Sequence, residues 1–465
     1  MKVIYIHIET SKRDYLSRLL LSFFATRMGF KVLLGDVLSF FKTVKNLKDK
    51  KGIFHFKDIA PSDLNLELFQ SLKNNGFLIT SIDEEGGIEY KEYDSKDFNS
   101  FLTARYSNET LSLVDQIFTW GEFDYKSLTE NFPEFKHKFI NTGNPRLDFC
   151  KLEFDKFYEK LNIHFTKNAE RPILIMSDIG NVMSAKNLSQ QVYINREAAK
   201  RTQGKEEKEK DQLEIYSNKI LYLSEFIQLI NKLTKEFPDQ KFLLRPHPTE
   251  SKNDWIKILG NHKNLEIVKD GDATSWIRKS KLMIHNSCYT AIDGAILKKP
   301  IISFCPPSCI KSKKYFTGKI GIQTNNINQV IDQIKNLISN PDKFNENISL
   351  NLKLIQSRLN LDSLSSKKQV ENWNNLFKKD SFKNFDIKGL NFNFFIFSFK
   401  INYLIRNFIK KLLHYDNKNL TKIEEFDVLE IKRNLNFFDE IFNEKEKKKF
   451  RINKISKYLC FIETL

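Results

Sequence analysis

Two short polar motifs stand directly after apolar runs in the second half of the chain. Residues 245–248 follow the run 242–244, and residues 285–293 follow the run 282–284. Short apolar runs of this kind are typical of buried strands. Polar residues at the carboxyl ends of strands in an α/β sheet are well placed to hold a phosphate group. The two motifs therefore predict a phosphate site, and with it an enzyme that uses a nucleotide-activated substrate.

The first motif carries an imidazole in a stiff turn. Pro246 and Pro248 flank His247 and restrict the backbone on both sides of it. His247 can donate a hydrogen bond to a phosphate oxygen or give a proton to a leaving group, and Arg245 can add a charge-assisted contact. A histidine beside a proline is more often structural when it stands alone. Its position after a strand, with a serine motif further along, favours a functional role.

The second motif begins where a strand gives way to a helix. An isolated serine at the position of Ser287 most often caps the helix with its side chain. Capping leaves other amides of the first turn free, and these amides, with the hydroxyls of Ser287 and Thr290, can bind a phosphate. Asp293 lies within the expected helix, where it either meets a ribose hydroxyl or remains a solvated acid.

A third motif, in the first half of the chain, places Asp83, Glu84 and Glu85 directly before Gly86 and after the apolar run 77–81. Glu84 or Glu85 can act as general base on an acceptor hydroxyl, with a pKa raised by the acidic neighbours. Asp83 and Gly86 are then expected on the acceptor side of the site. The alternatives are a metal site, for which surrounding ligands are missing, and a polar surface turn.

The elements that must position these motifs form two series. In residues 1–145, strand-like runs alternate with segments of helical period such as 15–27. The expected strands are 3–8, 31–34, 76–81, 116–120 and 138–142. This alternation predicts a parallel, doubly wound sheet. The breaker cluster 142–146 predicts a crossover to a second domain.

A second α/β series begins at the apolar run 172–176. Residues 196–219 are highly charged and are expected to form an exposed helix or a mobile excursion, followed by an amphipathic helix at 223–237. Further expected strands are 242–244, 282–285 and 300–304, and further expected helices are 275–279 and 289–297. We therefore expect an acceptor-side Rossmann-like domain (1–145), a nucleotide-donor Rossmann-like domain (146–375) and a basic, aromatic, helical C-terminal extension (376–465).

The overall composition fits this organisation. A chain of 465 residues exceeds one ordinary hydrophobic core, so two domains are the default. A net charge of +17 attracts anionic partners such as nucleotides, nucleic acid or an anionic leaflet, although a generally basic proteome also explains it. The basic residues are dispersed and no groove-reading module is recognisable, so we expect no nucleic-acid partner.

The cysteines and the first residues bear on location. The five cysteines are an odd number, and Cys305 and Cys309 lack a second pair that would complete a zinc site. Residues 1–14 have neither the length nor the flanks of a signal peptide, and no apolar run is long enough to span a membrane. These features predict reduced thiols and a cytoplasmic protein.

Residues 392–413 combine many aromatic and aliphatic side chains with Lys400, Arg406, Lys410 and Lys411. A helix of this composition suits an anionic membrane surface, which would place the protein peripherally on the inner face of the cell membrane. The same composition suits a terminal helix that crosses back to cover the first domain.

Taken together, the order and spacing of the three motifs resemble those of bacterial GT-B sialyltransferases and the related Kdo transferases. Residues 143–146, 245–248 and 285–293 are also similar to the CDP-glycerol glycerophosphotransferases. Residues 1–375 as a whole resemble the group of surface carbohydrate biosynthesis proteins. The resemblance implies the GT-B architecture, in which two doubly wound domains face each other across a cleft.

The resemblance also implies roles for individual residues. His247 and Ser287 would contact the phosphate of a CMP-linked donor, and His247 would protonate the departing nucleotide. Glu84 or Glu85 would deprotonate the acceptor, and no metal or cofactor besides the nucleotide sugar would be needed.

The sequence departs from the family pattern in two respects. Cys288 and Tyr289 stand where small or hydroxyl residues are usual, and Asp293 stands where a glutamate is expected. The shape of the phosphate pocket and the ribose contact are therefore left open by the resemblance.

We expect a metal-independent GT-B glycosyltransferase that moves a Kdo- or sialic-acid-like sugar from a CMP-activated donor to a surface polysaccharide or lipopolysaccharide. Its partners would be a nucleotide sugar and a glycan or lipid-linked acceptor. The alternatives are a CDP-glycerol or CDP-ribitol phosphotransferase, a UDP-sugar epimerase of the same fold, and a non-catalytic protein that recruits glycan-assembly partners to the membrane.

Overall fold

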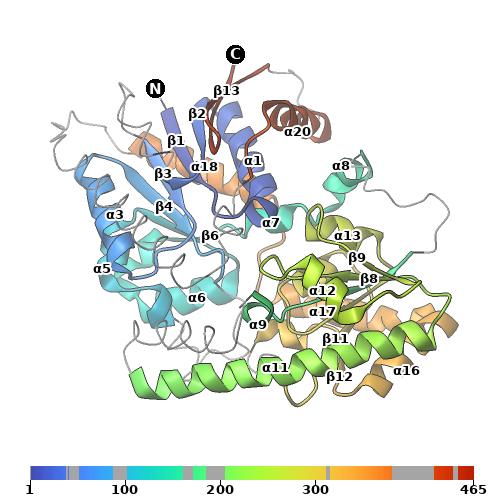
Figure 1. The fold of residues 1–465 in the computed structure, drawn as a ribbon. Helices are drawn as coiled ribbons and strands as arrows, with labels where there is room; N and C mark the ends of the chain where they lie inside the picture. Colours follow the sequence, from blue (N-terminus) through green and yellow to red (C-terminus); the bar gives the residue numbers. More distant parts are fainter. Residues whose placement is uncertain are drawn as a thin grey trace.

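Two sheets, each flanked by helices, form the framework of the protein (Figure 1). A computed structural model of the chain describes residues 2–37, 40, 52–86, 102–160, 171–184, 205–309, 315–379, 424–442 and 449–465. Residues 392–413, for which we predict a membrane-surface or terminal helix, lie outside this described part. Within it, no helix has the length and apolar character needed to cross a membrane.

The first sheet has the strand order β13-β14-β2-β1-β3-β4-β5-β6. Six of its described strands are parallel: β1 (Lys2–His7), β2 (Phe30–Gly35), β3 (Ile53–Phe56), β4 (Leu78–Ile82), β5 (Gln116–Thr119) and β6 (Phe139–Asn141). All five strands that the sequence predicts here are confirmed within two residues at each end. The short strand β3 was not predicted.

A C-terminal hairpin completes this sheet. β13 (Phe450–Ser456) pairs antiparallel with β14 (Leu459–Thr464), and β14 pairs antiparallel with β2. Helix is the prediction for the C-terminal part, and α20 (Val428–Ile441) is such a helix. The two strands are an addition to that prediction, and they carry the last residues back to the first sheet.

The second sheet has the order β12-β11-β10-β7-β8-β9, and its described strands are all parallel. The strands are β7 (Ile173–Met176), β8 (Phe242–Arg245), β9 (Leu265–Ile267), β10 (Leu282–His285), β11 (Ile301–Phe304) and β12 (Ile322–Thr324). β7, β8, β10 and β11 are the predicted apolar runs, buried throughout because helices cover both faces of a parallel sheet. Two facing, mainly parallel sheets with flanking helices constitute a GT-B-like fold.

Helices connect the strands of both units. In the first unit and its crossover they are α1 (Ser11–Arg27), α3 (Asp63–Asn74), α5 (Asn108–Leu113), α6 (Glu122–Asn131), α7 (Pro145–Asp148), α8 (Asp155–Lys160) and the 3-10 turns Pro133–Lys138 and Leu152–Phe154. In the second they are α9 (Asn181–Ser184), α11 (Lys205–Glu236), α12 (Lys252–Leu259), α13 (Ala273–Lys279), α14 (Thr290–Ile296), α16 (Ile327–Ser339), α17 (Asn345–Gln356) and the 3-10 turns Phe316–Lys319 and Pro341–Phe344.

The charged stretch predicted at 196–219 begins outside the described residues and continues as the first half of α11, the long helix at the bottom of Figure 1. The second half of α11 buries Phe226, Leu229 and Leu233 against the second sheet. This part confirms the predicted amphipathic helix.

The chain returns to the first unit after α17. Asn360 donates its backbone N–H to Trp120 O (2.8 Å), and Asp148 accepts the backbone N–H groups of Ser365 and Ser366 (2.8 and 2.9 Å). The following helix α18 (Ser365–Lys379) packs against α1. The two segments that connect the units, one before β7 and one after α17, are therefore hydrogen-bonded to each other through Asp148.

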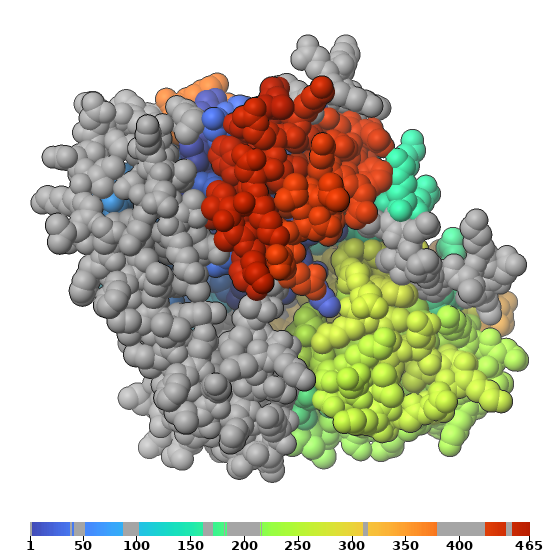
Figure 2. Space-filling model, turned by 45° about the horizontal axis from the view of Figure 1, so that its top comes forward, coloured from blue at the N-terminus to red at the C-terminus, as the bar shows by residue number. Residues whose placement is uncertain are grey.

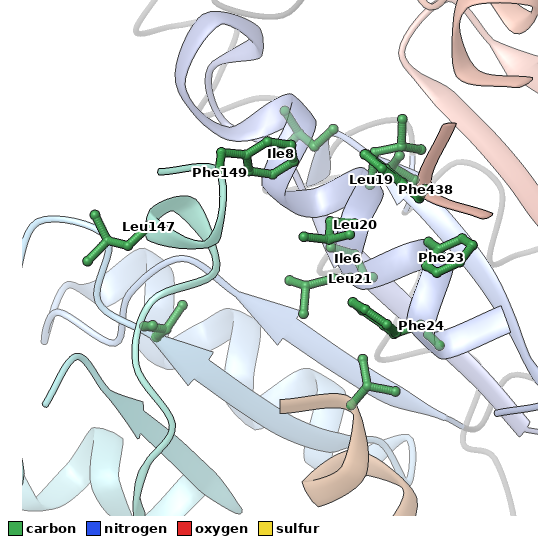
Figure 3. Close-up of a cluster of buried hydrophobic side chains, with 14 of the residues drawn as sticks. Ile6, Ile8, Leu19, Leu20, Leu21, Phe23, Phe24, Leu147, Phe149 and Phe438 are labelled. Carbon is green, nitrogen blue, oxygen red and sulfur yellow. The ribbon is translucent and has the colours of Figure 1, made fainter. Parts of the chain in front are cut away.

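Helix α1 is buried on nearly all sides, as Figure 3 shows for Leu19, Leu21 and Phe23. The sheet residue Ile6 lies against one side of the helix, and Phe438 of α20 lies on another. A helix that buries large apolar side chains on several sides is stable only where neighbours cover those sides. The C-terminal elements supply that cover, and they thereby fix the position of the amino end of α1.

Candidate active site

A cleft of about 790 Å³ lies between the two sheets. One wall consists of residues that follow β7, β8, β9 and β10, the carboxyl ends of four parallel strands. The opposite wall consists of the amino end of α1 and the loop after β4, and the crossover and the segment before α20 close the ends. The residues that line it include Lys12, Arg13, Tyr15, Glu84, Glu85, Arg146, Phe149, Ser177, Asp178, Arg245, His247, Thr274, Ser287, Cys288, Tyr289, Thr290, Asp293, Thr317, Phe426, Glu430 and Asn434.

The turn after β8 presents His247 to the cleft. The Nδ1 atom of His247 accepts the backbone N–H of Thr249 (3.3 Å) and lies 2.8 Å from the Thr249 hydroxyl. An imidazole nitrogen that accepts a backbone N–H is unprotonated, so the neutral ring carries its proton on Nε2. His247 is therefore oriented by its own turn, with Nε2 as its hydrogen-bond donor.

The motif predicts a phosphate contact for Arg245, but in the structure its guanidinium binds backbone carbonyl groups. Its guanidinium donates to the carbonyl oxygens of Asp270 (2.9 Å) and Gly271 (2.6 Å). Burial lowers the pKa of Arg245. Although Arg245 lines the cleft, its donors mainly hold the loop after β9 in place.

Glu250, which no sequence motif singled out, connects two loops of the donor wall, the loop after β7 and the turn after β8. Its fully buried carboxylate accepts the backbone N–H groups of Ile179 and Gly180 (both 2.8 Å) and the indole N–H of Trp255 (2.8 Å). These bonds hold the loop after β7, which contains Ser177 and Asp178, against the turn after β8. The pairing joins residues about seventy positions apart, so no local pattern announces it.

Ser287 is not the cap of the following helix, contrary to the usual role of a serine at such a position. Helix α14 begins at Thr290, and its N-cap Tyr289 makes no side-chain capping bond. Ser287 instead adopts a left-handed backbone with φ 67°. The Ser287 backbone N–H donates to His285 Nδ1 (3.1 Å), and the Ser287 carbonyl accepts from the Thr317 hydroxyl (2.6 Å). Strained backbone of this kind is concentrated at functional sites.

Two serine hydroxyls in the donor wall are buried without a partner. The Oγ atoms of Ser177 and Ser287 have no hydrogen-bond partner among the described residues, and the two residues are only 2% and 5% exposed. A buried polar atom without a partner is unfavourable, so such atoms indicate where a ligand supplies the missing bond.

His285 supports this arrangement rather than taking part in chemistry. Its Nδ1 accepts the Ser287 N–H and its Nε2 lies 2.8 Å from the carbonyl oxygen of Ile320. Burial lowers the pKa of His285 to about 4, so the ring is neutral at physiological pH.

Cys288 and Tyr289 shape the pocket next to Ser287. The thiol of Cys288 is hydrogen-bonded to the hydroxyl of Thr290, and burial raises the pKa of Cys288 to about 12. A protonated thiol is a poor nucleophile. Tyr289 packs edge-on against Trp120 of the other unit with ring centroids 5.4 Å apart.

Asp293 lies deep in the cleft and accepts a hydrogen bond from the Thr274 hydroxyl (3.3 Å). Burial raises its pKa to about 6, and the positive charge of Arg146 acts in the opposite direction. The location of Asp293 on the first turn of α14 is the predicted one, but the carboxyl is buried rather than solvated.

Arg146 lies between the two walls and was not predicted as a site residue. Its guanidinium carbon stands 4.5 Å from the centre of the Tyr289 ring, and its Nη1 is 4.0 Å from Glu84 Oε2. Arg146 belongs to the cluster 142–146, after which the chain runs through α7 and α8 to β7 of the second sheet. That position brings the cation into the centre of the cleft.

The four residues 83–86 of the acidic loop after β4 fall into two groups, according to whether they line the cleft. Glu84 and Glu85 line the cleft, whereas Asp83 and Gly86, although described, do not. Asp83 forms a two-pronged ion pair with Arg105, and its carbonyl accepts the indole N–H of Trp120 (2.7 Å). Asp83 therefore anchors the loop.

The two cleft carboxylates differ in surroundings. Glu84 is buried, with Oε1 2.6 Å from Arg18 Nη2 and Oε2 accepting from Asn144 Nδ2 (3.3 Å). Glu85 exposes 54% of its side chain and lies 3.5 Å from Arg13 and 3.5 Å from Arg105. Each acid of the loop thus meets an arginine, so the loop lacks the uncompensated negative charge that its sequence suggests.

The described residues contain no group of three or more His, Cys, Asp and Glu side chains arranged to hold a metal ion. Metal-independent chemistry remains a prediction from the sequence.

The chain matches no protein-family model and no curated protein. Among solved structures it is similar to a UDP-GlcNAc 2-epimerase from Neisseria meningitidis bound to UDP-GlcNAc, with 14% identity, 82% of this chain and 100% of that chain covered, and a TM-score of 0.47. The UDP-GlcNAc 2-epimerase of Methanocaldococcus jannaschii in complex with UDP-GlcNAc and UDP is 12% identical, with 81% and 100% covered and a TM-score of 0.44. The wall teichoic acid polymerase TagF with CDPG is 12% identical, with 81% and 89% covered and a TM-score of 0.48. At such low identities the function has to be inferred from the site itself.

Proposed function

We propose that this protein is a glycosyltransferase that moves a Kdo- or sialic-acid-like sugar from a CMP-activated donor to a surface glycan. One observation carries the proposal: the cleft sets His247 and two serine hydroxyls that have no partner among the described residues on one wall, opposite Glu84 and Glu85 on the other. A donor phosphate and an acceptor hydroxyl require these two kinds of groups on opposite sides.

The donor wall is suited to a phosphate. The hydroxyls of Ser177 and Ser287 and the Nε2–H of His247 are neutral hydrogen-bond donors, and Arg146 adds a positive charge near them. Charge-assisted bonds from arginine to phosphate oxygens are among the stronger hydrogen bonds in proteins. Leaving-group departure would be assisted by a hydrogen bond from the Nε2–H of His247 to the phosphate oxygen, because this bond stabilises the negative charge that develops there.

Glu85 is the better candidate for the general base. Both oxygens of Glu84 are engaged by Arg18 and Asn144, whereas much of the Glu85 side chain is exposed in the cleft. A base must reach the acceptor hydroxyl and be able to take its proton. We therefore assign proton abstraction to Glu85, and to Glu84 the task of holding Arg146 near the donor phosphate.

The choice of CMP rests on the resemblance of the three motifs to CMP-sugar-dependent transferases. A thermal-shift series with CMP, CDP, UDP and GDP tests it, because a ligand that binds only the folded state raises stability. CMP is expected to give the largest shift. A shift with UDP alone would contradict the donor assignment.

The epimerase alternative predicts a different product. Incubation of UDP-GlcNAc with the protein and no acceptor would then give a second nucleotide sugar, detectable by proton NMR. A transferase leaves the nucleotide sugar unchanged or slowly hydrolyses it. A CDP-glycerol phosphotransferase would instead release CMP from CDP-glycerol and leave CMP-Kdo intact.

A further inference from the structure

Residues 424–434, which include the start of α20, form a C-terminal segment that closes one end of the cleft. None of these residues has a role in the proposed donor chemistry. The backbone N–H of Glu424 donates to the Ser11 hydroxyl (2.8 Å), which ties the segment to the amino end of α1. The backbone N–H of Phe426 donates to Lys457 O (2.9 Å), and the Lys454 ammonium donates to Phe426 O (2.8 Å). Figure 2 shows the red C-terminal residues beside the yellow-green second unit. The segment is therefore a fixed wall.

A buried amide on this wall has an unused acceptor. Asn434 of α20 lines the cleft and is only 2% exposed, and its Oδ1 has no hydrogen-bond partner among the described residues. Burial and Glu430 raise the pKa of Tyr15, whereas a hydrogen bond from the Asn434 side chain lowers it. The Asn434 side chain therefore lies next to the Tyr15 hydroxyl. The unpartnered Oδ1 of this amide can accept a hydrogen bond from a ligand.

The surroundings of Asn434 match the surface of a sugar. The rings of Tyr15 and Phe426, with centroids 6.2 Å apart, and that of Phe149 line the same cleft and give this part of it an apolar lining next to the polar groups, as sugar binding requires. Glu430, also on the wall, adds a carboxylate that accepts hydrogen bonds from hydroxyls. An acceptor amide and a carboxylate favour hydroxyl donors and repel a phosphate or a second carboxylate.

We propose that Tyr15, Phe426, Glu430 and Asn434 form the binding site for an uncharged sugar of the acceptor glycan, in which Asn434 Oδ1 accepts a hydrogen bond from a sugar hydroxyl. The inference rests on the proposed function, since it assigns the acceptor side of the same cleft. It selects a neutral terminal sugar over one that carries a phosphate or a carboxylate.

The test uses the full chain and the methyl glycosides of glucose, galactose and N-acetylglucosamine as probes, observed by saturation-transfer NMR. At least one glycoside is expected to bind. Asn434→Leu should weaken it by about tenfold, the effect of one lost hydrogen bond to a buried acceptor. Asn436→Leu is the matched control, because Asn436 carries the same amide on the outer face of the same helix. This control should bind like the wild type.

A second variant, Tyr15→Phe, keeps the inference testable if Asn434→Leu does not fold. Tyr15→Phe keeps the ring and removes only the hydroxyl that faces the amide, and it should also weaken glycoside binding. Absence of saturation transfer to all three glycosides, unchanged binding in both variants, or tighter binding of glucose 6-phosphate than of methyl glucoside would each overturn the inference.

The nucleotide thermal shifts separate this inference from the proposed function. Both variants should keep the wild-type shift with CMP, because Asn434 and Tyr15 lie on the acceptor side. If no nucleotide stabilises the wild type while a glycoside still binds through Asn434, the donor proposal fails and the sugar site stands.

Discussion

Arg18 and Glu84 form an ion pair inside the protein: Arg18 Nη2 lies 2.6 Å from Glu84 Oε1, and the side chains are 1% and 2% exposed. The other end of the Arg18 guanidinium lies 3.2 Å from His55 Nε2, and His55 Nδ1 is 3.1 Å from the Thr80 hydroxyl. Burial holds the pKa of His55 well below its ordinary value, so the ring is neutral and can accept from arginine. A chain of hydrogen bonds thus leads from the core of the first unit to a carboxylate of the cleft.

Removing one partner of this pair should destabilise the fold. Arg18→Met leaves Glu84 buried without its cation, and the free energy of unfolding should fall by about 3–5 kcal/mol. Denaturant unfolding of the full chain measures the change. Adding Glu84→Gln to Arg18→Met should restore part of the loss, because no uncompensated charge then remains. A double variant less stable than Arg18→Met would contradict the ion-pair account.

His247 should matter for transfer and not for folding. His247→Ala removes the proposed hydrogen-bond donor to the leaving phosphate, and transfer from a CMP-sugar should fall by roughly 10²–10³-fold with little change in the thermal midpoint. His262→Ala is a suitable control, since His262 contacts Thr234 and lies outside the residues that line the cleft. Equal transfer by the two variants would exclude His247 from the mechanism.

Ser287 has a strained backbone and a hydroxyl that is proposed to bind the phosphate, and a glycine substitution separates these two effects. Ser287→Gly relieves the left-handed backbone, which should raise stability by roughly 1 kcal/mol, but removes the hydroxyl and should weaken CMP binding. Lys298 also has a left-handed backbone, with φ 53°. Lys298→Gly should therefore give a similar gain in stability, measured by denaturant unfolding, with CMP binding unchanged. A Ser287→Gly variant that binds CMP as well as the wild type would remove Ser287 from the phosphate site.

Asp293 should make stability depend on pH. Burial raises its pKa from 3.8 to about 6, so the folded state holds a proton that the unfolded state releases between these values. Its contribution to stability is therefore greatest below pH 3.8, falls as the pH rises to about 6, and stays low above that. Asp293→Asn should be more stable than the wild type at pH 7, by at most roughly 3 kcal/mol, and similar near pH 4. Denaturant unfolding of both proteins near pH 4 and at pH 7 measures the difference in their free energies of unfolding. An equal difference at the two pH values would contradict the raised pKa of Asp293.

The sequence predicted those elements whose signal is local. β7, β8 and β10 are continuous apolar runs ended by polar residues, and the motifs at their ends do reach one cleft. β9 and β12 have three residues each, too few for an alternation or a run to be recognised.

The parts of the site that could not be predicted depend on long-range pairing. Arg18 meets Glu84 across 66 positions, and Arg146 reaches the cleft only because the crossover passes through it. The motif around Ser287 predicted its place but not its backbone, since the left-handed turn depends on bonds to His285 and Thr317.

The pairing of β14 with β2 has a consequence for biogenesis. Leu34 is opposite Cys460 in this ladder, so the two strands are separated by almost the whole chain. During synthesis, the outer edge of β2 stays open while the second unit is already complete, and an open strand edge invites association with other chains. The cleft receives its last wall, from the segment before α20, only when this hairpin is added. A nascent chain can therefore acquire its donor wall well before it acquires the site proposed for the acceptor.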